Sequence, residues 1–571
     1  MTVASASARA VSRLLVALGA MALLCTTASA QTTVTATDVS GGGNWNAATT
    51  WNCPSGPSPC IPNDDLSYLF DVAINSGIVI LNTPSSTQAF VIEALNVATG
   101  ATFKATGGSL LTVNGTLTNS GTTSVGDSGI TTATEVIAAG LSNTGTVNIT
   151  GTLTVQASLQ LTGPASANPF LPATGLLAAG TYTLTNDALL EYSGPGIAGV
   201  GSAVTVTLDG AGASIDATSL AANNASTANT NSALDTLATN AGTLVLENGA
   251  SVITNSGLSL VNTGTINVDQ SSQSGNGGST FGVGGLLTNG GQITIGNGQA
   301  LTSPVTASVG GLLDNTGTLN VHGNISLPSP VSASLDVAGA AFSAGIPTQA
   351  FTAVNSGTVN LASDASVSVT GTYDNLGTTN VDTSTDTVNG KIYSGGSVLN
   401  VSGILSNPGY QLGIGRAMVN LGGSNATLNL GNASLTLPTE ITASGLDNFG
   451  TVNITGAQGV QALLDLTGPA SANPFVQPPG AVNAGTYNLT NDAVLEYNGP
   501  GISAIGPGVT VNLNGAGASI EAATLAPNNA CKKQRDIPEL RKIRHMTPPK
   551  TKNAGATSTP AQRISASRWS K

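Results

Sequence analysis

A short phrase, Asn-x-Gly-Thr followed by an alternating segment, returns along most of this chain and constrains its fold more than any other feature. The phrase begins at Asn119, Asn143, Asn240, Asn262, Asn315, Asn355, Asn375 and Asn448, with a variant at Asn289. Several neighbouring copies lie 20 to 27 residues apart. Asn tolerates a left-handed backbone and Gly takes positive φ without steric cost, so each phrase predicts a turn. The segment after the turn, such as Thr146-Val147-Asn148-Ile149, alternates as a half-buried strand does.

A strand-and-turn unit of this length cannot bury its own apolar side, but stacked units close a continuous core. The repeat therefore predicts an all-β fold, a right-handed parallel β-helix (solenoid). Some twenty coils spaced by about 4.8 Å would make a rod roughly 100 Å long. Asn at the same corner of successive coils is expected to form a hydrogen-bonded turn ladder. A propeller would need blades of about 40 residues with aromatic signatures, and a sandwich would need several domains, whose boundaries nothing in the sequence marks.

A much larger repeat lies within the smaller one. Residues 140–225 and 445–530 align without a gap at a constant offset of 305, and about two-thirds of the positions are identical. Both copies contain Leu-Thr-Gly-Pro-Ala-Ser-Ala-Asn-Pro-Phe, which ends at Phe170 and at Phe475. We interpret this as a segmental duplication and expect each copy to build the same few coils with one protruding loop.

The first thirty residues predict a signal peptide. Arg9 and Arg13 precede an apolar stretch, and Ala28-Ser29-Ala30 supplies small residues for cleavage. The stretch is short for a membrane span, and Leu24 before Cys25 argues against a lipoprotein. We therefore expect an exported protein, extracellular or at the cell surface, with no integral membrane segment in the mature chain.

Residues 531–571 break the pattern, because they hold 11 of the 16 Lys and Arg residues and show no strand alternation. We expect this basic tail to be disordered. Since the break falls inside a repeated unit, we favour a tail foreign to the fold, from a frameshift or a gene fragment. A genuine basic arm for the cell wall or membrane is the alternative.

The rest of the chain is acidic. Between residues 31 and 530 there are three basic residues, Lys104, Lys391 and Arg416, against 26 of the 28 acids, so the net charge there is near −23. Such a surface disfavours nucleic acid and anionic lipid as partners. Only 8% of all residues are charged, but the β-branched alternation argues against disorder.

The opening segment carries the remaining candidate residues. Cys53 and Cys60 flank a proline-rich loop, and in an exported chain they predict a disulfide rather than a metal site, which would need more ligands nearby. Trp45 and Trp51 are expected to cover the open end of the first coil, whose unpaired edges would otherwise invite aggregation. Stacking of the two indoles on a sugar is the alternative. We divide the mature chain into a cap at 31–75 and a solenoid at 76–530.

The order Gly43-Asn44-Trp45, Trp51, Pro62-Asn63-Asp64-Asp65 and Val72-Ala73-Ile74 resembles the opening of bacterial autotransporter passengers and related β-strand-repeat surface proteins. The resemblance implies a right-handed β-helix and a role as adhesin, biofilm component or surface spacer. Its partners would be host or environmental glycans, surface proteins or other copies of the chain. A translocator barrel needs many strands with aromatic girdles, and the carboxy-terminal region shows none. We expect either that the barrel was lost with the true carboxy terminus or that another protein performs secretion.

An extracellular polysaccharide-degrading β-helix, a lyase or a glycosidase, is the rival hypothesis. The three basic residues are too dispersed for a lyase base. Asp187 and Glu191, repeated as Asp492 and Glu496, would lie about 13 Å apart along a strand, farther than glycosidase mechanisms use. Asp64-Asp65 predict a capped turn, with calcium binding as the minor alternative, and His322 has no nucleophile motif beside it. We expect no catalytic residues and no cofactor. An enzyme would cluster its carboxylates in a groove, whereas a structural protein would scatter them.

Overall fold

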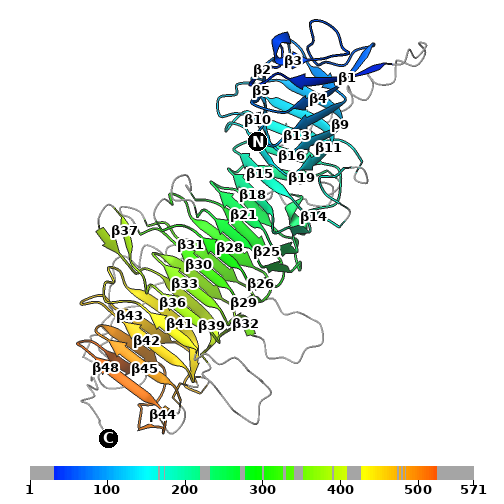
Figure 1. Cartoon of the computed structure of the whole chain (residues 1–571). Helices are drawn as coiled ribbons and strands as arrows, with labels where there is room; N and C mark the ends of the chain where they lie inside the picture. The colour runs from blue at the N-terminus through cyan, green and yellow to red at the C-terminus, as the bar shows by residue number, and fades with distance from the viewer. Residues whose placement is uncertain are drawn as a thin grey trace, which may run out of the picture.

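The computed structural model describes residues 31–523, except 165–167, 173, 219–231, 271–276, 299–300, 326–329, 340–350, 389–390, 408–425, 472, 474, 477–479 and 483. The predicted signal peptide and basic tail lie outside the described residues. Within this part the protein is an all-β solenoid, so the predicted fold class is confirmed. Parallel strands stack coil upon coil into an elongated rod (Figure 1). Each regular coil contributes three strands, and these form three faces.

The first face, here the long face, runs from one end of the rod to the other without interruption. Neighbouring strands pair in parallel and in register throughout. Its strands are β2 (Gly42–Asn44), β5 (Ile78–Leu81), β8 (Thr102–Ala105), β10 (Thr122–Gly126), β12 (Thr146–Thr150), β15 (Gly180–Thr185), β18 (Val204–Asp209), β21 (Thr243–Glu247), β24 (Thr265–Val268), β27 (Gln292–Ile295), β30 (Thr318–His322), β33 (Thr358–Ala362), β36 (Thr378–Val381), β40 (Thr427–Leu430), β42 (Thr451–Thr455), β45 (Thr486–Thr490) and β48 (Thr510–Asn514).

The second face, here the ladder face, holds the strands that end at the predicted corner asparagines. Its strands are β7 (Ala94–Val97), the second halves of β9 (Leu110–Asn119) and β11 (Thr134–Asn143), β14 (Leu176–Leu177), β17 (Gly199–Val200), β20 (Thr239–Asn240), β23 (Leu260–Asn262), β26 (Leu287–Asn289), β29 (Leu313–Asn315), β32 (Phe351–Asn355), β35 (Thr372–Asn375), the second halves of β39 (Val398–Asn407) and β41 (Thr439–Asn448), β44 (Ala481–Val482) and β47 (Ala504–Ile505). It is interrupted after β11 and again after β41, where β14 and β44 begin new sheets.

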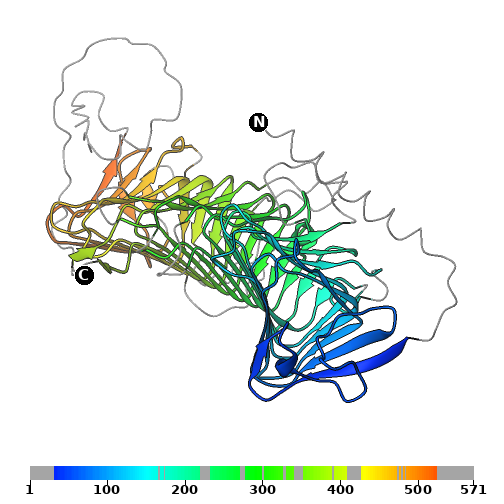
Figure 2. The same ribbon diagram turned by 90° about the horizontal axis from the view of Figure 1, so that it is seen from above.

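The third face, here the acidic face, carries most of the stacked carboxylates described below. Its strands are β6 (Phe90–Ile92), the first halves of β9, β11, β39 and β41, and then β13 (Ala157–Leu161), β16 (Ala188–Tyr192), β19 (Ser214–Ala217), β22 (Ser251–Ile253), β25 (Thr280–Val283), β28 (Val305–Val309), β31 (Ala333–Val337), β34 (Ala365–Val369), β43 (Ala462–Leu466), β46 (Ala493–Tyr497) and β49 (Ser519–Ala522). It breaks between β19 and β22, where η2 (Leu234–Thr236) intervenes, and the rod bends in this region (Figures 1 and 2).

Alternation along every strand creates the core. Inward side chains are Val, Leu, Ile, Ala and Phe, and they form one buried cluster that extends from Val34 to Tyr497. The outward positions are mostly Thr, Ser and Asn. Burial of apolar area across successive coils is therefore what stabilises the rod.

The first coil begins earlier than the sequence suggests. β1 (Thr32–Asp38) already pairs in parallel with β4 (Tyr68–Ile74), so solenoid strands start within the segment expected to be a cap. A shorter insertion between β1 and β4 covers the open end of the first coil. The insertion contains η1 (Ala48–Thr50) and β3 (Trp51–Asn52), and β3 pairs antiparallel with β1. A small hairpin, β37 (Asp386–Val388) with β38 (Lys391–Tyr393), projects from a corner near the other end (Figure 1).

The two duplicated segments fold alike. β11 to β19 and β41 to β49 correspond strand by strand at the offset of 305, with end residues differing by at most one. The shared loop does not simply protrude, because Phe170 and Phe475 insert into the core and are 4% and 3% exposed. Phe170 meets the rings of Tyr182 and Tyr192 edge to face, and Phe475 meets Tyr487 and Tyr497 in the same way.

Candidate functional site on the long face

The outer surface of the long face carries a column of threonines, one at the start of almost every strand. These residues pair directly across neighbouring strands, which lie about 4.8 Å apart in a parallel sheet, and they are half-buried or exposed. The column consists of Thr102, Thr122, Thr146, Thr181, Thr205, Thr243, Thr265, Thr318, Thr358, Thr378, Thr427, Thr451, Thr486 and Thr510, with Gln292 at one position.

A second column runs beside the first, two residues further along each strand and on the same side of the sheet. Over seven successive strands this position is Asn, and from the second strand onward each Nδ2 donates to the Oδ1 of the preceding coil at 2.7 or 2.8 Å. The column is Asn320, Asn360, Asn380, Asn429, Asn453, Asn488 and Asn512. This outer ladder was not predicted from the sequence, although the repeated string Thr-x-Asn signals it.

The two columns are almost free of charge. Lys104 is the only charged side chain among them in the described strands β8 to β48, and it pairs with Asp127 at 3.2 Å. Asp209 and Glu247 lie at the ends of long-face strands, beyond the two columns, and the body's other acids lie at corners and on the other two faces. The two columns thus form an ordered, neutral, hydrogen-bonding surface on an acidic rod.

The inner turn ladder forms as predicted and includes two further residues. Within each run the Nδ2 of every member except the last donates to the Oδ1 of the next coil at 2.7 to 3.0 Å, and every member is buried. One run joins Asn119 to Asn143; a longer run comprises Asn240, Asn262, Asn289, Asn315, Asn355, Asn375, Asn407 and Asn448. Asn289 had been noted as a variant, and Asn407 was missed because no Gly-Thr follows it.

Both runs stop at the same place in the duplicated unit. Asn143 and Asn448 are equivalent, and each lies beside the hydroxyl of a buried tyrosine, Tyr182 or Tyr487. Burial raises the pKa of Tyr182 to about 12, so it stays a neutral hydroxyl. The ladder ends where the loop that carries the inserted phenylalanine replaces a regular corner.

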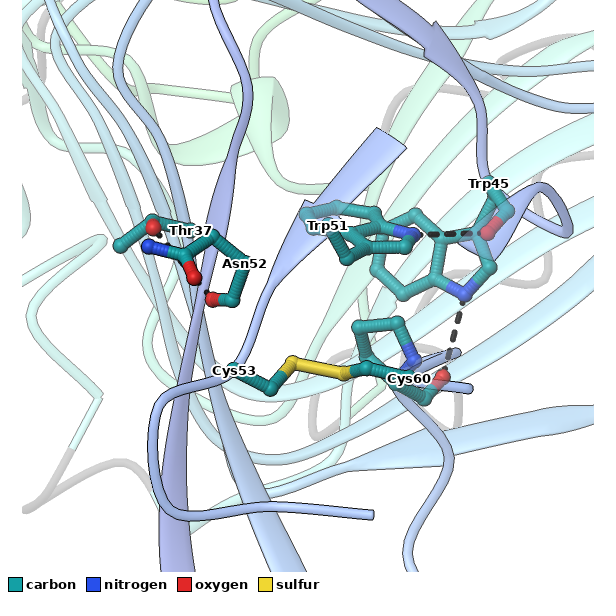
Figure 3. The surroundings of a disulfide bond; sticks show 7 residues. Thr37, Trp45, Trp51, Asn52, Cys53 and Cys60 are labelled. Atoms are coloured by element: carbon teal, nitrogen blue, oxygen red, sulfur yellow. Dashed lines mark hydrogen bonds between the residues drawn. A yellow bond between two sulfur atoms is a disulfide. The ribbon is translucent and has the colours of Figure 1, made fainter. Parts of the chain in front are cut away.

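The cap residues are buried together at the amino-terminal end (Figure 3). The Trp51 indole N–H donates to the carbonyl of Trp45 at 2.7 Å, and the Trp45 N–H donates to the carbonyl of Pro62 at 3.1 Å. The rings meet edge to face at 4.9 Å. Cys53 and Cys60 form the predicted disulfide. With the two tryptophans 0% and 5% exposed, neither ring offers a face on which a sugar could stack.

The remaining acids near the cap act in turns, as expected. The carboxylate of Asp65 accepts from the backbone N–H groups of Ser67 and Tyr68 at 2.7 and 2.8 Å. Asp64 accepts from the N–H of Phe70 at 2.6 Å, and burial raises the pKa of Asp64.

On the acidic face, carboxylates stack across coils instead of being scattered, which corrects our expectation. Asp465, Glu496 and Glu521 occupy directly paired positions on β43, β46 and β49. Burial, with Glu496 and Glu440 nearby, raises the pKa of Asp465 to about 6. In the first copy of the duplicated segment, Gln160 occupies the position equivalent to Asp465. Its side-chain amide donates a hydrogen bond to the carboxylate of Glu135.

A groove of about 550 Å³ lies further along the rod, at the edge of the acidic face, and it contains Asp235 and Asp336. Burial, with Asp216 nearby, raises the pKa of Asp235 to about 6. The backbone carbonyl of Asp235 accepts a hydrogen bond from the backbone N–H of Asn255, which lies on the next coil. Asp336 lies three coils beyond Asn255. Four strand spacings separate these two acids by about 19 Å, too far for either glycosidase geometry.

His322 has an acidic partner that the sequence did not reveal. Its Nε2 lies 2.8 Å from Asp386 of the β37–β38 hairpin, and the hydroxyl of Ser363 bonds to the same carboxylate. Hydrogen bonds from His322 and Ser363 outweigh burial and lower the pKa of Asp386. The carboxylate lies between Ser and His, whereas nucleophilic catalysis needs His between the other two. These contacts attach the hairpin to the rod.

The described residues contain no group of three or more His, Cys, Asp and Glu side chains placed to hold a metal ion. No helix within them has the length and apolar character needed to cross a membrane. Comparison with known protein families, curated proteins and solved structures found no match to this chain.

Proposed function

We propose that this protein is an exported, cell-surface structural rod that makes adhesive contacts and performs no catalysis of its own. The observation that carries the proposal is the long face: two neutral Thr and Asn columns in register along an otherwise acidic solenoid. Repeated identical groups allow many weak contacts to act together, so that avidity exceeds the strength of any single contact. Glycans, surface proteins or further copies of the chain are the proposed partners.

The cellular location rests on the sequence. The amino-terminal segment has the features of a secretory signal, and the Cys53–Cys60 disulfide suits an oxidising compartment. The opening motif resembles that of autotransporter passengers, which we take as a proposal for the class of surface protein. The buried Trp pair and the disulfide close one end of the rod and leave its length exposed for contact.

Deletion of the gene, followed by measurement of surface attachment and biofilm mass, tests the proposal. We expect the deletion strain to attach less. Complementation with the native gene should restore attachment, and a long-face variant, Thr318→Lys with Thr358→Lys and Thr378→Lys, should not. A matched control carries Ser334→Lys and Ser366→Lys on the acidic face and should restore it. Unchanged attachment after deletion would refute the adhesive role.

The acidic face favours one second candidate, a retaining glycosidase. Asp465 and Glu496 sit on adjacent strands about 4.8 Å apart, near the carboxylate separation of about 5 Å that retaining enzymes use. The raised pKa of Asp465, about 6, suits a general acid. Purified protein would then cleave a neutral or acidic polysaccharide, and Asp465→Asn would abolish the cleavage while Glu191→Gln, in the other copy, would not. Absence of cleavage across a polysaccharide panel would remove this candidate.

A further inference from the structure

We propose that the long face, from β30 to β48, binds ice: it orders water into a lattice that merges with the side plane of an ice crystal. The proposal goes beyond adhesion, because it assigns one specific ligand to the long face. It rests on the spacing, the neutrality and the rigidity of the Thr and Asn columns.

The spacing of the columns is close to that of tetrahedral water. Waters 2.7 to 2.8 Å apart in tetrahedral geometry place next-nearest oxygens about 4.5 Å apart and repeat along the crystal axis about every 7.3 Å. On the long face, neighbouring strands are about 4.8 Å apart. The Thr and the Asn of one strand are two residues apart in sequence and about 6.7 Å apart in space. The mismatch along the rod reaches about 2 Å over seven rungs. Waters bound between the columns, rather than the side chains themselves, would therefore complete the match.

The composition of the face also fits this ligand. From β30 to β48 every rung carries Thr in the first column and Asn in the second, and no charged residue interrupts either column. A charged side chain would orient its own hydration shell and break the water lattice. The acidic face, where Asp465, Glu496 and Glu521 stack, offers no such surface.

The Asn column is held rigid. Each amide of this column is bonded to its neighbour at 2.7 or 2.8 Å, so the side chains cannot turn independently. Thr has a stiff χ1, which limits the hydroxyl positions in the first column. A surface ordered before binding loses little entropy when it orders water.

The test uses the full purified chain, ice as the probe, and three measurements: crystal shape, thermal hysteresis and partition into a growing ice front. The wild type should produce faceted crystals and enter the ice. Thr318→Tyr, Thr358→Tyr and Thr378→Tyr, introduced together, should abolish both effects, because three rings stand above the plane. The control, Ser334→Tyr with Ser366→Tyr on the acidic face, should behave as the wild type. Circular dichroism confirms that each variant keeps the β fold.

If the triple variant does not fold, the single variant Thr358→Lys replaces it, since exposed positions tolerate substitution. It places one charge at the second of the seven Thr positions and should also remove faceting. Wild-type protein that leaves ice crystals round overturns the proposal, as does equal activity in the long-face and acidic-face variants. Light scattering that shows a dimer broken by the tyrosines would assign the face to a second copy and would likewise overturn it.

Discussion

The inner and outer ladders consist of the same amide–amide hydrogen bond, but the inner one is buried and the outer one lies at the surface. The effect of burial on the stability that this bond contributes can therefore be measured within one molecule. Asn262 in the inner ladder is 0% exposed, accepts from Asn240 at 2.8 Å, and donates to Asn289 and to the carbonyl of Gln292 at 2.8 and 3.2 Å. Asn360 in the outer ladder donates to Asn320 at 2.8 Å and is only half-buried. We compare Asn262→Ala with Asn360→Ala.

The expected costs differ because water can replace only the outer partner. In Asn262→Ala the Oδ1 of Asn289 loses its ladder donor in the interior, and Asn240 keeps one of its two inter-coil acceptors, the carbonyl of Thr265 at 3.1 Å. A buried acceptor left without a donor costs about 1–3 kcal/mol, and the lost bonds and the small cavity bring the total to about 3–4 kcal/mol. Asn360→Ala removes two ladder bonds, to Asn320 and from Asn380, but water can replace both, so the variant should cost only about 0.5–1 kcal/mol.

Native-state hydrogen exchange is the suitable assay, because a repeat array unfolds locally and one global midpoint can hide the change. Protection of the amides in β24 and β27 should fall by about 3 kcal/mol in Asn262→Ala, and protection in β33 should fall by at most about 1 kcal/mol in Asn360→Ala. Equal losses in the two variants would refute the reasoning that burial, and not the bond itself, sets the cost.

Three further predictions follow from other contacts. Leu208→Ala, at a fully buried site, should cost about 2–5 kcal/mol of local stability, whereas its duplicate Leu513→Ala, on β48, the more exposed last strand of the long face, should cost clearly less; equal losses in hydrogen exchange would contradict this. The pKa of Asp465, raised to about 6, makes its coil most stable below about pH 4 and less stable as pH rises through 6, so Asp465→Asn should flatten that pH dependence of local exchange, and an unchanged slope would count against the raised pKa. Cys53→Ala with Cys60→Ala opens a loop with a sequence separation of 7 and should lower stability by about 2.5 kcal/mol, measured by denaturation with and without reductant; a difference near zero would show that the Trp pair alone holds the cap.

The sequence predicts what depends on local chemistry. Asn followed by Gly-Thr gives the corner, and the alternation after it gives the strand, so the solenoid and the inner ladder follow from the chain alone. Asn407 was not predicted because Tyr410 stands where the phrase has Thr, although the alternation before Asn407 indicates the same type of strand. The disulfide was predictable because Cys53 and Cys60 are close in sequence.

The contacts that the sequence does not predict depend on how the coils stack. Asp465 and Glu496 are 31 residues apart, yet they are neighbours across one strand spacing. Distances measured along a single strand missed this pair. Asp386 reaches His322 over 64 residues only because a hairpin projects from the corner. The pairing register of the acidic-face strands reveals the first pair, and no local pattern signals the second.

The duplication has a consequence for how such a rod can change in evolution. Ten successive pairings separate β12 from its duplicate β42 on the long face, so the 305-residue offset equals a whole number of turns of the helix. Recombination between the two copies would therefore add or remove complete coils and keep every column in phase. The length of the rod could therefore change by gene rearrangement, without selection of new residues at either junction.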